Sequence, residues 1–179
     1  MNKLTVNING TSLEVDYGTT LETISRNYQK DFKYDIIVAK VDGLYRELTE
    51  TITKNCEIEF FDLMNRGANG IYLNGLVYLT IYTFKQLFGK KADLKVNHSL
   101  DKGLYIESNM KIQKEDIESL EIKMKELIAE NLPITKMTVS RLEAMEYFKN
   151  IGDEVKSEIM KYITSTHLTL YKLGDMYDY

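Results

Sequence analysis

Apolar and polar residues alternate along the first part of the chain, with the period of two that is typical of a half-buried β-strand. The alternation runs over residues 4–8, stops at Asn9-Gly10 and resumes over residues 13–15. Asparagine followed by glycine favours the positive φ angles that a two-residue hairpin turn requires. The pattern therefore predicts a β-hairpin that turns at Asn9-Gly10.

A helix is predicted next, over residues 20–30, because Leu21, Ile24 and Tyr28 fall on one face at helical spacing. The segment Thr19-Thr20-Leu21-Glu22 predicts a capping box at its start. Three β-rich runs follow, over residues 35–41, 44–48 and 57–61, with a tight turn at Asp42-Gly43. The order ββαβββ within residues 1–62 predicts a ubiquitin-like β-grasp domain.

A polar, glycine-containing segment separates this part from the rest of the chain. Residues 63–70 carry two glycines and two asparagines without an apolar period, which predicts an interdomain linker. The following residues 71–88 are apolar around much of a helical circumference, so they predict a central, largely buried helix. We expect a second domain over residues 71–179.

The second domain is predicted to mix helices and strands, which makes the whole chain α+β. Ser140, with Glu143 three residues on, predicts a capped helix that stops before Gly152. The other predicted elements are strands at 93–97, 103–108 and 168–173 and helices at 115–131 and 153–163. The aromatic, abrupt end of the sequence suggests that this domain is truncated at its C-terminal end.

Composition narrows the class of protein. The net charge of −4 argues against a nucleic-acid surface spread over the whole molecule, although Lys85, Lys90, Lys91 and Lys95 form a local basic cluster. The single cysteine, Cys56, excludes a disulfide within the chain and is expected to be a packed thiol. No segment approaches a membrane span and no signal peptide is visible, so we expect a cytoplasmic protein that does not enter a membrane.

The sequence holds no complete catalytic constellation. There is no phosphate-binding GxxxxGK[ST] loop, since Gly89-Lys90 is followed by Lys91 and Phe84 stands where the first glycine belongs. Only two histidines are present, His98 and His167, and their spacing gives no zinc site. We therefore predict no catalytic residue, no metal site and no cofactor in this chain.

The first 62 residues resemble the TGS domain found in threonyl-tRNA synthetases, stringent-response synthetases and some GTPases, through VNINGTSLEVDYGTTLETIS and IIVAKVDGLYREL. The rest resembles the editing domain shared by threonyl- and alanyl-tRNA synthetases, through LNGLVYLTIYTFKQLFG and KEDIESLEIKMKELIAENLPI. In the register set by Lys85-Gln86-Leu87, Asn74 and Tyr78 replace the two metal-binding histidines of that family. The family's second metal motif, a cysteine with a nearby histidine, would come just beyond Tyr179. The resemblance therefore implies the ancestry of an editing enzyme without its metal ligands.

A subgroup of bacterial uridine-kinase-like proteins is similar in NHSLDKGLY and LTLYKLGDMYDY. That similarity implies that the chain is a non-catalytic region that has a regulatory role or binds a ligand or RNA. It would precede a P-loop kinase domain in the same polypeptide, and that kinase domain would use ATP and magnesium. The alternative is a threonyl-tRNA synthetase-type N-terminal region, or a free-standing editing homologue that has lost its metal-binding histidines. A nucleoside, a nucleotide or tRNA would be the ligand, and assembly into an oligomer stays open. The ligand contacts expected from the resemblance are Asn74, Tyr78, His98 and Tyr105.

Overall fold

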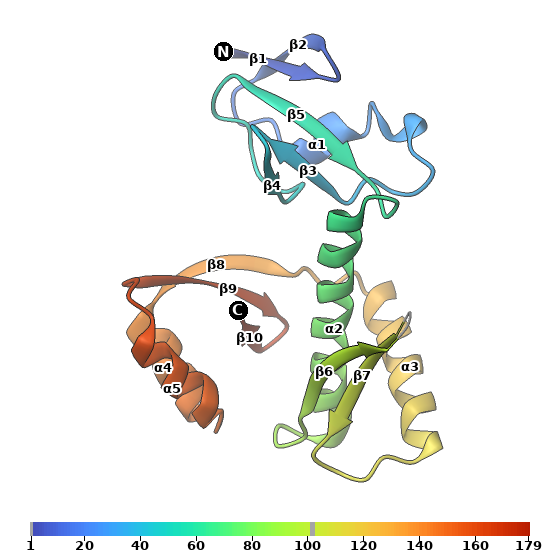
Figure 1. The fold of residues 1–179 in the computed structure, drawn as a ribbon, viewed down its shortest axis with the longest axis vertical. Coiled ribbons are helices and arrows are strands. Elements are labelled where there is room, and N and C mark those ends of the chain that lie inside the picture. The colour runs from blue at the N-terminus through green and yellow to red at the C-terminus, as the bar shows by residue number, and fades with distance from the viewer. Residues whose placement is uncertain (1, 101–102) are drawn as a thin grey trace. The chain divides into compact units, whose positions relative to one another are not determined.

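The computed structural model describes residues 2–100 and 103–179, which form two compact units, residues 1–76 and 77–179 (Figure 1). Helices make up 38% and strands 31% of the chain, so the predicted α+β class is confirmed. None of the helices in the described ranges is both long enough and apolar enough to cross a membrane.

The first unit contains a five-stranded sheet with the order β2-β1-β5-β3-β4. Strands β1 and β5 pair in parallel and the other neighbours pair antiparallel. Both predicted turns are confirmed, because Asn9-Gly10 and Asp42-Gly43 have positive φ angles. The strands are β1 (Lys3–Ile8), β2 (Thr11–Asp16), β3 (Val38–Val41), β4 (Leu44–Arg46) and β5 (Cys56–Phe61).

The helix of the first unit is shorter than predicted. It covers only α1 (Leu21–Ser25), and a separate 3₁₀ turn follows at η1 (Gln29–Asp31). The predicted capping box is wrong in detail: the hydroxyl of Thr20 accepts from the backbone N–H of Thr23, and Glu22 pairs instead with Arg26 at 2.9 Å. The helix still buries its apolar face in a core whose members include Val6, Ile8, Leu21, Ile24, Ile58 and Phe60.

Helix α2 (Arg66–Phe88) begins five residues before the predicted start, so residues 66–70 of the predicted linker are helical. Asn65 causes this early start, because its side-chain Oδ1 accepts from the backbone N–H groups of Gly67 and Ala68 at 2.9 and 3.1 Å. The helix is also less buried than predicted, since Ala68 is buried but Ile71, Tyr72 and Leu73 are exposed. The two compact units divide inside α2, and the domain boundary at 63–70 stays a prediction.

The second unit holds a two-stranded ribbon of β6 (Leu94–Leu100) and β7 (Gly103–Ser108), followed by α3 (Lys114–Ala129). A three-stranded antiparallel sheet, order β10-β9-β8, follows with α4 and α5 between β8 and β9. The capping box of Ser140 and Glu143 is confirmed at the start of α4. The remaining bounds are β8 (Thr135–Ser140), α4 (Arg141–Asn150), α5 (Glu154–Tyr162), β9 (His167–Leu173) and β10 (Met176–Asp178), of which β8 and β10 were not predicted.

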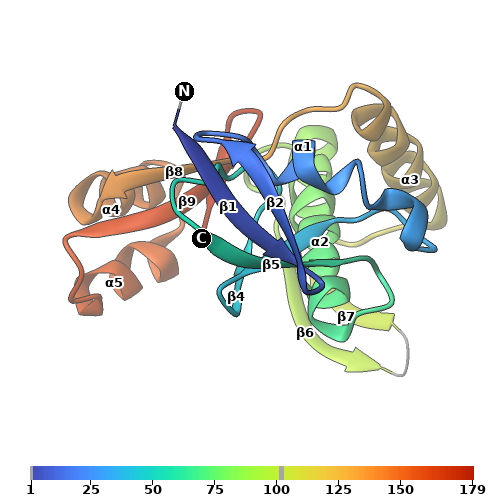
Figure 2. The ribbon, with the colours of Figure 1, turned by 90° about the horizontal axis from the view of Figure 1, so that it is seen from above.

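The core of the second unit has two parts. Helices α4 and α5 lie side by side (Figures 1 and 2) and enclose Phe148 and Met160, both fully buried, together with Leu170 of β9. The second part joins Tyr82 of α2 to Leu173 and Met176 at the turn between β9 and β10. The β9–β10 hairpin therefore lies between α2 and the α4–α5 pair.

Candidate functional site

Tyr78 is placed at the β9–β10 hairpin by α2. Its hydroxyl group lies 2.7 Å from the carbonyl oxygen of Tyr171 and 3.0 Å from that of Met176, so it donates a hydrogen bond to this hairpin. Burial, followed by the nearby charge of Asp178, raises the pKa of Tyr78 well above its ordinary value. The phenol therefore keeps its proton at neutral pH.

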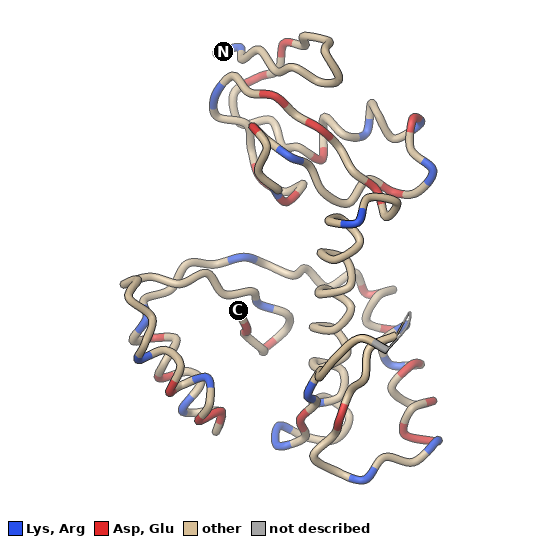
Figure 3. Tube along the Cα trace, in the orientation of Figure 1, with Lys and Arg blue, Asp and Glu red and all other residues tan. Residues whose placement is uncertain are grey.

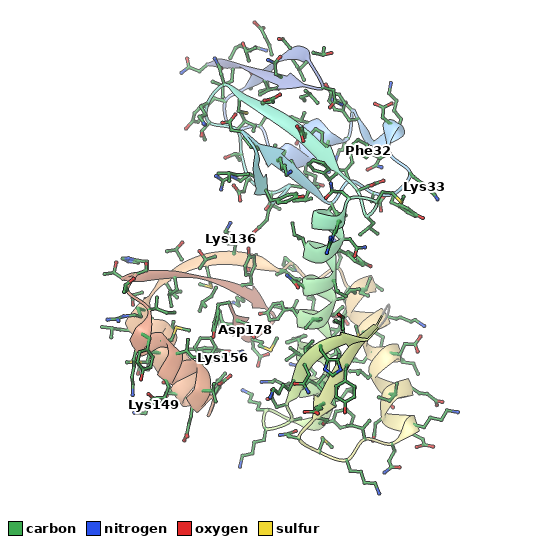
Figure 4. All side chains as sticks on the ribbon, viewed as in Figure 1. Phe32, Lys33, Lys136, Lys149, Lys156 and Asp178 are labelled. Atoms are coloured by element: carbon green, nitrogen blue, oxygen red, sulfur yellow. The ribbon has the colours of Figure 1, made fainter. Side chains whose placement is uncertain are left out.

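Lys156 and Asp178 form an ion pair beside Tyr78. The Lys156 Nζ lies 2.7 Å from Oδ2 of Asp178 and 3.7 Å from Oδ2 of Asp153, and the side chains of Lys156 and Asp178 are only 30% and 21% exposed. Burial by itself would lower the pKa of Lys156, but the hydrogen bond and the charge of Asp178 more than offset this and leave that pKa raised. The ammonium is therefore charged at all physiological pH values. Figure 4 shows the pair between α5 and the end of the chain.

Aromatic rings surround this pair. The ammonium of Lys156 lies 5.5 Å from the ring centre of Phe148 and 5.8 Å from that of Tyr179, within the range of cation–π attraction. Tyr147 packs edge to face on Tyr177 with ring centres 5.0 Å apart, and its hydroxyl accepts from the Tyr177 backbone N–H. We call the group of Tyr78, Tyr147, Lys156, Tyr177 and Asp178 the Lys156 site.

This site offers a charged donor and a carboxylate acceptor at a half-buried position next to an exposed ring. Tyr179 is 53% exposed and its ring lies at the edge of the site. Such a combination can hold a polar group by hydrogen bonds and a flat base by stacking.

The other predicted contacts lie elsewhere. Asn74 is exposed one helical turn before Tyr78, in the first compact unit. His98 and Tyr105 are cross-strand partners on β6 and β7, and their exposed rings stack with centres 5.1 Å apart. Asp101 and Lys102 of the NHSLDKGLY segment are outside the described residues. The assignment of Asn74, Tyr78, His98 and Tyr105 as ligand contacts stays a prediction.

Tyr105 also lines a cleft of about 510 Å³ between α2, β7 and α3. Its walls are mainly apolar, and Glu107 is its one charged lining residue among the described residues. The lining shares no residue with the Lys156 site; it consists of Thr80, Phe84, Leu94, Tyr105, Ile106, Glu107, Ser108, Met110, Ile112, Ile117 and Leu120.

The residues present do not fit the metal that the editing-domain resemblance implies. Across residues 2–100 and 103–179, no three histidine, cysteine, aspartate or glutamate side chains come together in a metal-binding group. The phenol at position 78 is protonated and bonded to backbone carbonyls, so it is a poor metal ligand. Cys56 packs against the core of the first unit, and burial raises the pKa of its thiol, which also disfavours the metal-binding thiolate.

The sequence analysis missed Lys156 and Asp178. Asp153, which the sequence placed as the first residue of the predicted helix 153–163, instead caps α5 by accepting from the backbone N–H of Lys156 at 3.0 Å. The weak signal for Lys156 was its place on α5, next to Ser157 and four residues before Met160, both of which face the core. Asp178 gave no signal, because its partner lies 22 residues earlier in the chain.

Comparison with models of protein families found no match. Individual proteins do match over nearly the whole chain. The threonine–tRNA ligase of Finegoldia magna is 29% identical over 173 residues, and that of an Exiguobacterium strain is 30% identical over 176 residues, each covering 94% of this chain. The threonine–tRNA ligase of Aquifex aeolicus is 28% identical over 183 residues, covering 99% of this chain. The chain is homologous to the N-terminal region of threonyl-tRNA synthetases.

The chain spans about a quarter of the length of these ligases, at 27% for two of them and 28% for the third. These matches favour the synthetase-type alternative over the uridine-kinase interpretation, for which they give no support. The activity of the whole ligases does not follow for this chain from the similarity.

Proposed function

We propose that this chain is a threonyl-tRNA synthetase-type N-terminal region that binds tRNA, with the aminoacylated 3′ end at the Lys156 site. The observation that carries the proposal is the similarity to threonine–tRNA ligases over 94% of the chain. We do not propose hydrolysis by a metal-held water, because the side chains of residues 2–100 and 103–179 do not form a metal-binding group.

The architecture supports the same origin. We propose that residues 1–62 form a TGS-like β-grasp domain, since the sheet places its first and last strands, β1 and β5, in parallel at the centre, beside α1. We propose that the second unit derives from the editing domain of these synthetases. Tyr78 then stands where that domain has a histidine, and the phenol holds the β9–β10 hairpin by hydrogen bonds.

The chemistry of the Lys156 site suits the end of an aminoacylated tRNA. That end carries phosphates, ribose hydroxyl groups and the α-ammonium of the amino acid. Lys156 offers a charged donor for the phosphate or hydroxyl oxygens, and Asp178 offers acceptors for the α-ammonium and hydroxyl groups. The exposed ring of Tyr179 gives a surface on which the terminal base stacks.

The net charge of −4 requires that the contact be local. Binding that depends on a few phosphates weakens with salt, but less steeply than for a protein covered with lysine. We therefore expect modest affinity, concentrated at one site.

Fluorescence anisotropy with labelled tRNA specific for threonine tests the proposal. Lys156→Met, which keeps the length of the side chain and removes its charge, should weaken binding about tenfold, equivalent to about 1.4 kcal/mol. Lys149→Met is the matched control, because Lys149 is an exposed lysine on the neighbouring α4 (Figure 4) and should change affinity less than about twofold. Circular dichroism of both variants checks that they fold. Equal affinity for the two variants, or no binding by the native chain, would overturn the proposal.

A further inference from the structure

Helix α5 is apolar on the face that it turns to solvent. Val155, Ile159 and Tyr162 follow one another at the i, i+4, i+7 spacing that places side chains on one helical stripe. Their side chains are 70%, 42% and 82% exposed, whereas Ser157 and Met160 on the opposite face are buried. We call Val155, Ile159 and Tyr162 the α5 stripe.

A surface helix normally keeps its solvent face polar, so a regular apolar stripe indicates a surface that another molecule covers. The exposed apolar residues on α3 do not form such a stripe, because Ile117, Ile122 and Ile128 do not follow i, i+3, i+4 spacing.

The charges beside the α5 stripe indicate what covers it. Glu154 lies in the first turn of α5 and Lys161 in the last, and both flank the stripe on the same side with Glu158 between them. Lys161 forms an ion pair with Glu158 within the helix. Figure 3 shows acidic and basic residues interspersed along this helix.

An antiparallel copy of the same helix matches this arrangement. Residues on equivalent flanks of two antiparallel helices face each other in reverse order, so Glu154 of each copy lies opposite Lys161 of the other. The two helix dipoles are also opposed in this orientation, which is favourable. Glu158 meets its own equivalent, and Lys161, which pairs with Glu158 in its own helix, lies between that carboxylate and Glu154 of the other copy.

We propose that the α5 stripe binds the α5 stripe of a second copy of this chain, antiparallel, across a two-fold axis. Such an interface is self-complementary and closed, as a symmetric dimer requires. A helix of nine residues is only about 14 Å long, so the contact is smaller than the standard interface of about 800 Å² per partner. The dimer is therefore weak and forms at high protein concentration.

Sedimentation velocity between about 5 and 500 μM, which brackets the range expected for a weak contact, tests the proposal. The sedimentation coefficient of the native chain should rise with concentration, and Val155→Asp combined with Tyr162→Asp should keep the chain monomeric. Both residues are highly exposed, so these changes should leave the fold intact. Leu44→Asp is the matched control, because Leu44 is 61% exposed on β4 and lies outside the stripe.

Charge reversal tests the antiparallel orientation. Glu154→Lys and Lys161→Glu should each weaken the dimer about fivefold, and the double variant should restore it, because each exchanged pair is again of opposite charge. A native chain that stays monomeric at every concentration would overturn the proposal. So would a dimer that survives the two aspartate substitutions, and failure of the double charge reversal to restore association would overturn the antiparallel arrangement. None of these substitutions touches the Lys156 site, so the result is independent of tRNA binding.

Discussion

The hydroxyl oxygen of Tyr45 stands 2.1 Å from the position that a β-carbon at Gly67 would occupy. The same hydroxyl donates a hydrogen bond to Oδ1 of Asn65 at 3.1 Å, and that oxygen caps the start of α2. The first turn of α2 is therefore fitted against β4, and a β-carbon at position 67 would force the 39% exposed Tyr45 side chain to move.

Gly67→Ala should destabilise the first unit by about 0.5–1.5 kcal/mol, because the methyl group would displace the Tyr45 ring end and break its hydrogen bond to Asn65. Gly70→Ala is the control. Gly70 is exposed on the same helix, and a β-carbon added there would have nothing within 4 Å, so alanine should stabilise by about 0.5–1 kcal/mol. Urea unfolding measures the change in stability of each variant, and hydrogen exchange of the β3 and β4 amides shows whether that change is located in the first unit. Two variants with the same sign and size of effect would contradict the close fit at Gly67.

Tyr78→Phe should lower the free energy of unfolding of the second unit by about 1–2 kcal/mol, since it removes the donor that serves the carbonyl groups of Tyr171 and Met176. Faster hydrogen exchange should be confined to β9 and β10. Tyr72→Phe provides the comparison, because Tyr72 is 46% exposed and its change should be within about 0.5 kcal/mol. If the amides of β9 and β10 exchange at the same rates in Tyr78→Phe as in the native chain, the hydroxyl group of Tyr78 does not stabilise the hairpin.

Alkaline pH should destabilise the second unit. The pKa values of Tyr78 and Tyr147 are raised, in both cases chiefly by burial, and that of Lys156 is raised by Asp178 against the effect of burial. A group whose pKa is higher in the folded protein contributes fully to the stability of the fold below its pKa in the unfolded chain, which is about 10 for tyrosine and lysine. That contribution is lost as the pH rises through the pKa of the group in the folded protein. Unfolding by urea should therefore become easier from about pH 10 upward and be nearly constant from about pH 7 to 9. The slope should be smaller in Tyr78→Phe. An unchanged slope would show that Tyr78 does not titrate with folding.

Metal removal should leave the fold unchanged. Melting temperatures with and without a chelator, and with added zinc, should agree within about 1 °C, because a structural metal site would contribute several kcal/mol and a shift of many degrees. A chelator-induced loss of stability would indicate ligands that the described residues do not bring together.

Local signals allowed much of the fold to be predicted. The turns at Asn9-Gly10 and Asp42-Gly43 and the cap at Ser140 depend on neighbouring residues, and all three were confirmed. The start of α2 was not predictable in the same way, because Asn65 acts as its cap while Tyr45, 20 residues earlier, packs against it. Strand β10 was missed because it is only three residues long and forms by pairing with β9, whereas the alternation of Met137 and Val139 in β8 was a signal that was overlooked.

The candidate site shows the same division. Tyr78 was found through a family register, but its hydrogen-bond partners lie more than 90 residues later in the chain. A lysine in a short helix, such as Lys156, is normally exposed to solvent. Asp178 becomes its ion-pair partner only because β10 folds beside α5. A single sequence reveals neither member of such a pair, because each residue alone is an ordinary surface charge.

Hydrogen exchange of the native chain with and without a tRNA specific for threonine tests the proposed binding most directly, because it locates the contact as well as detecting it. Our account predicts slower exchange in α5 and in the β9–β10 hairpin when tRNA is bound, with loss of this protection in Lys156→Met. Protection confined to other elements, or none at a tRNA concentration of about 100 μM, far above that needed for a useful binding site, would contradict it.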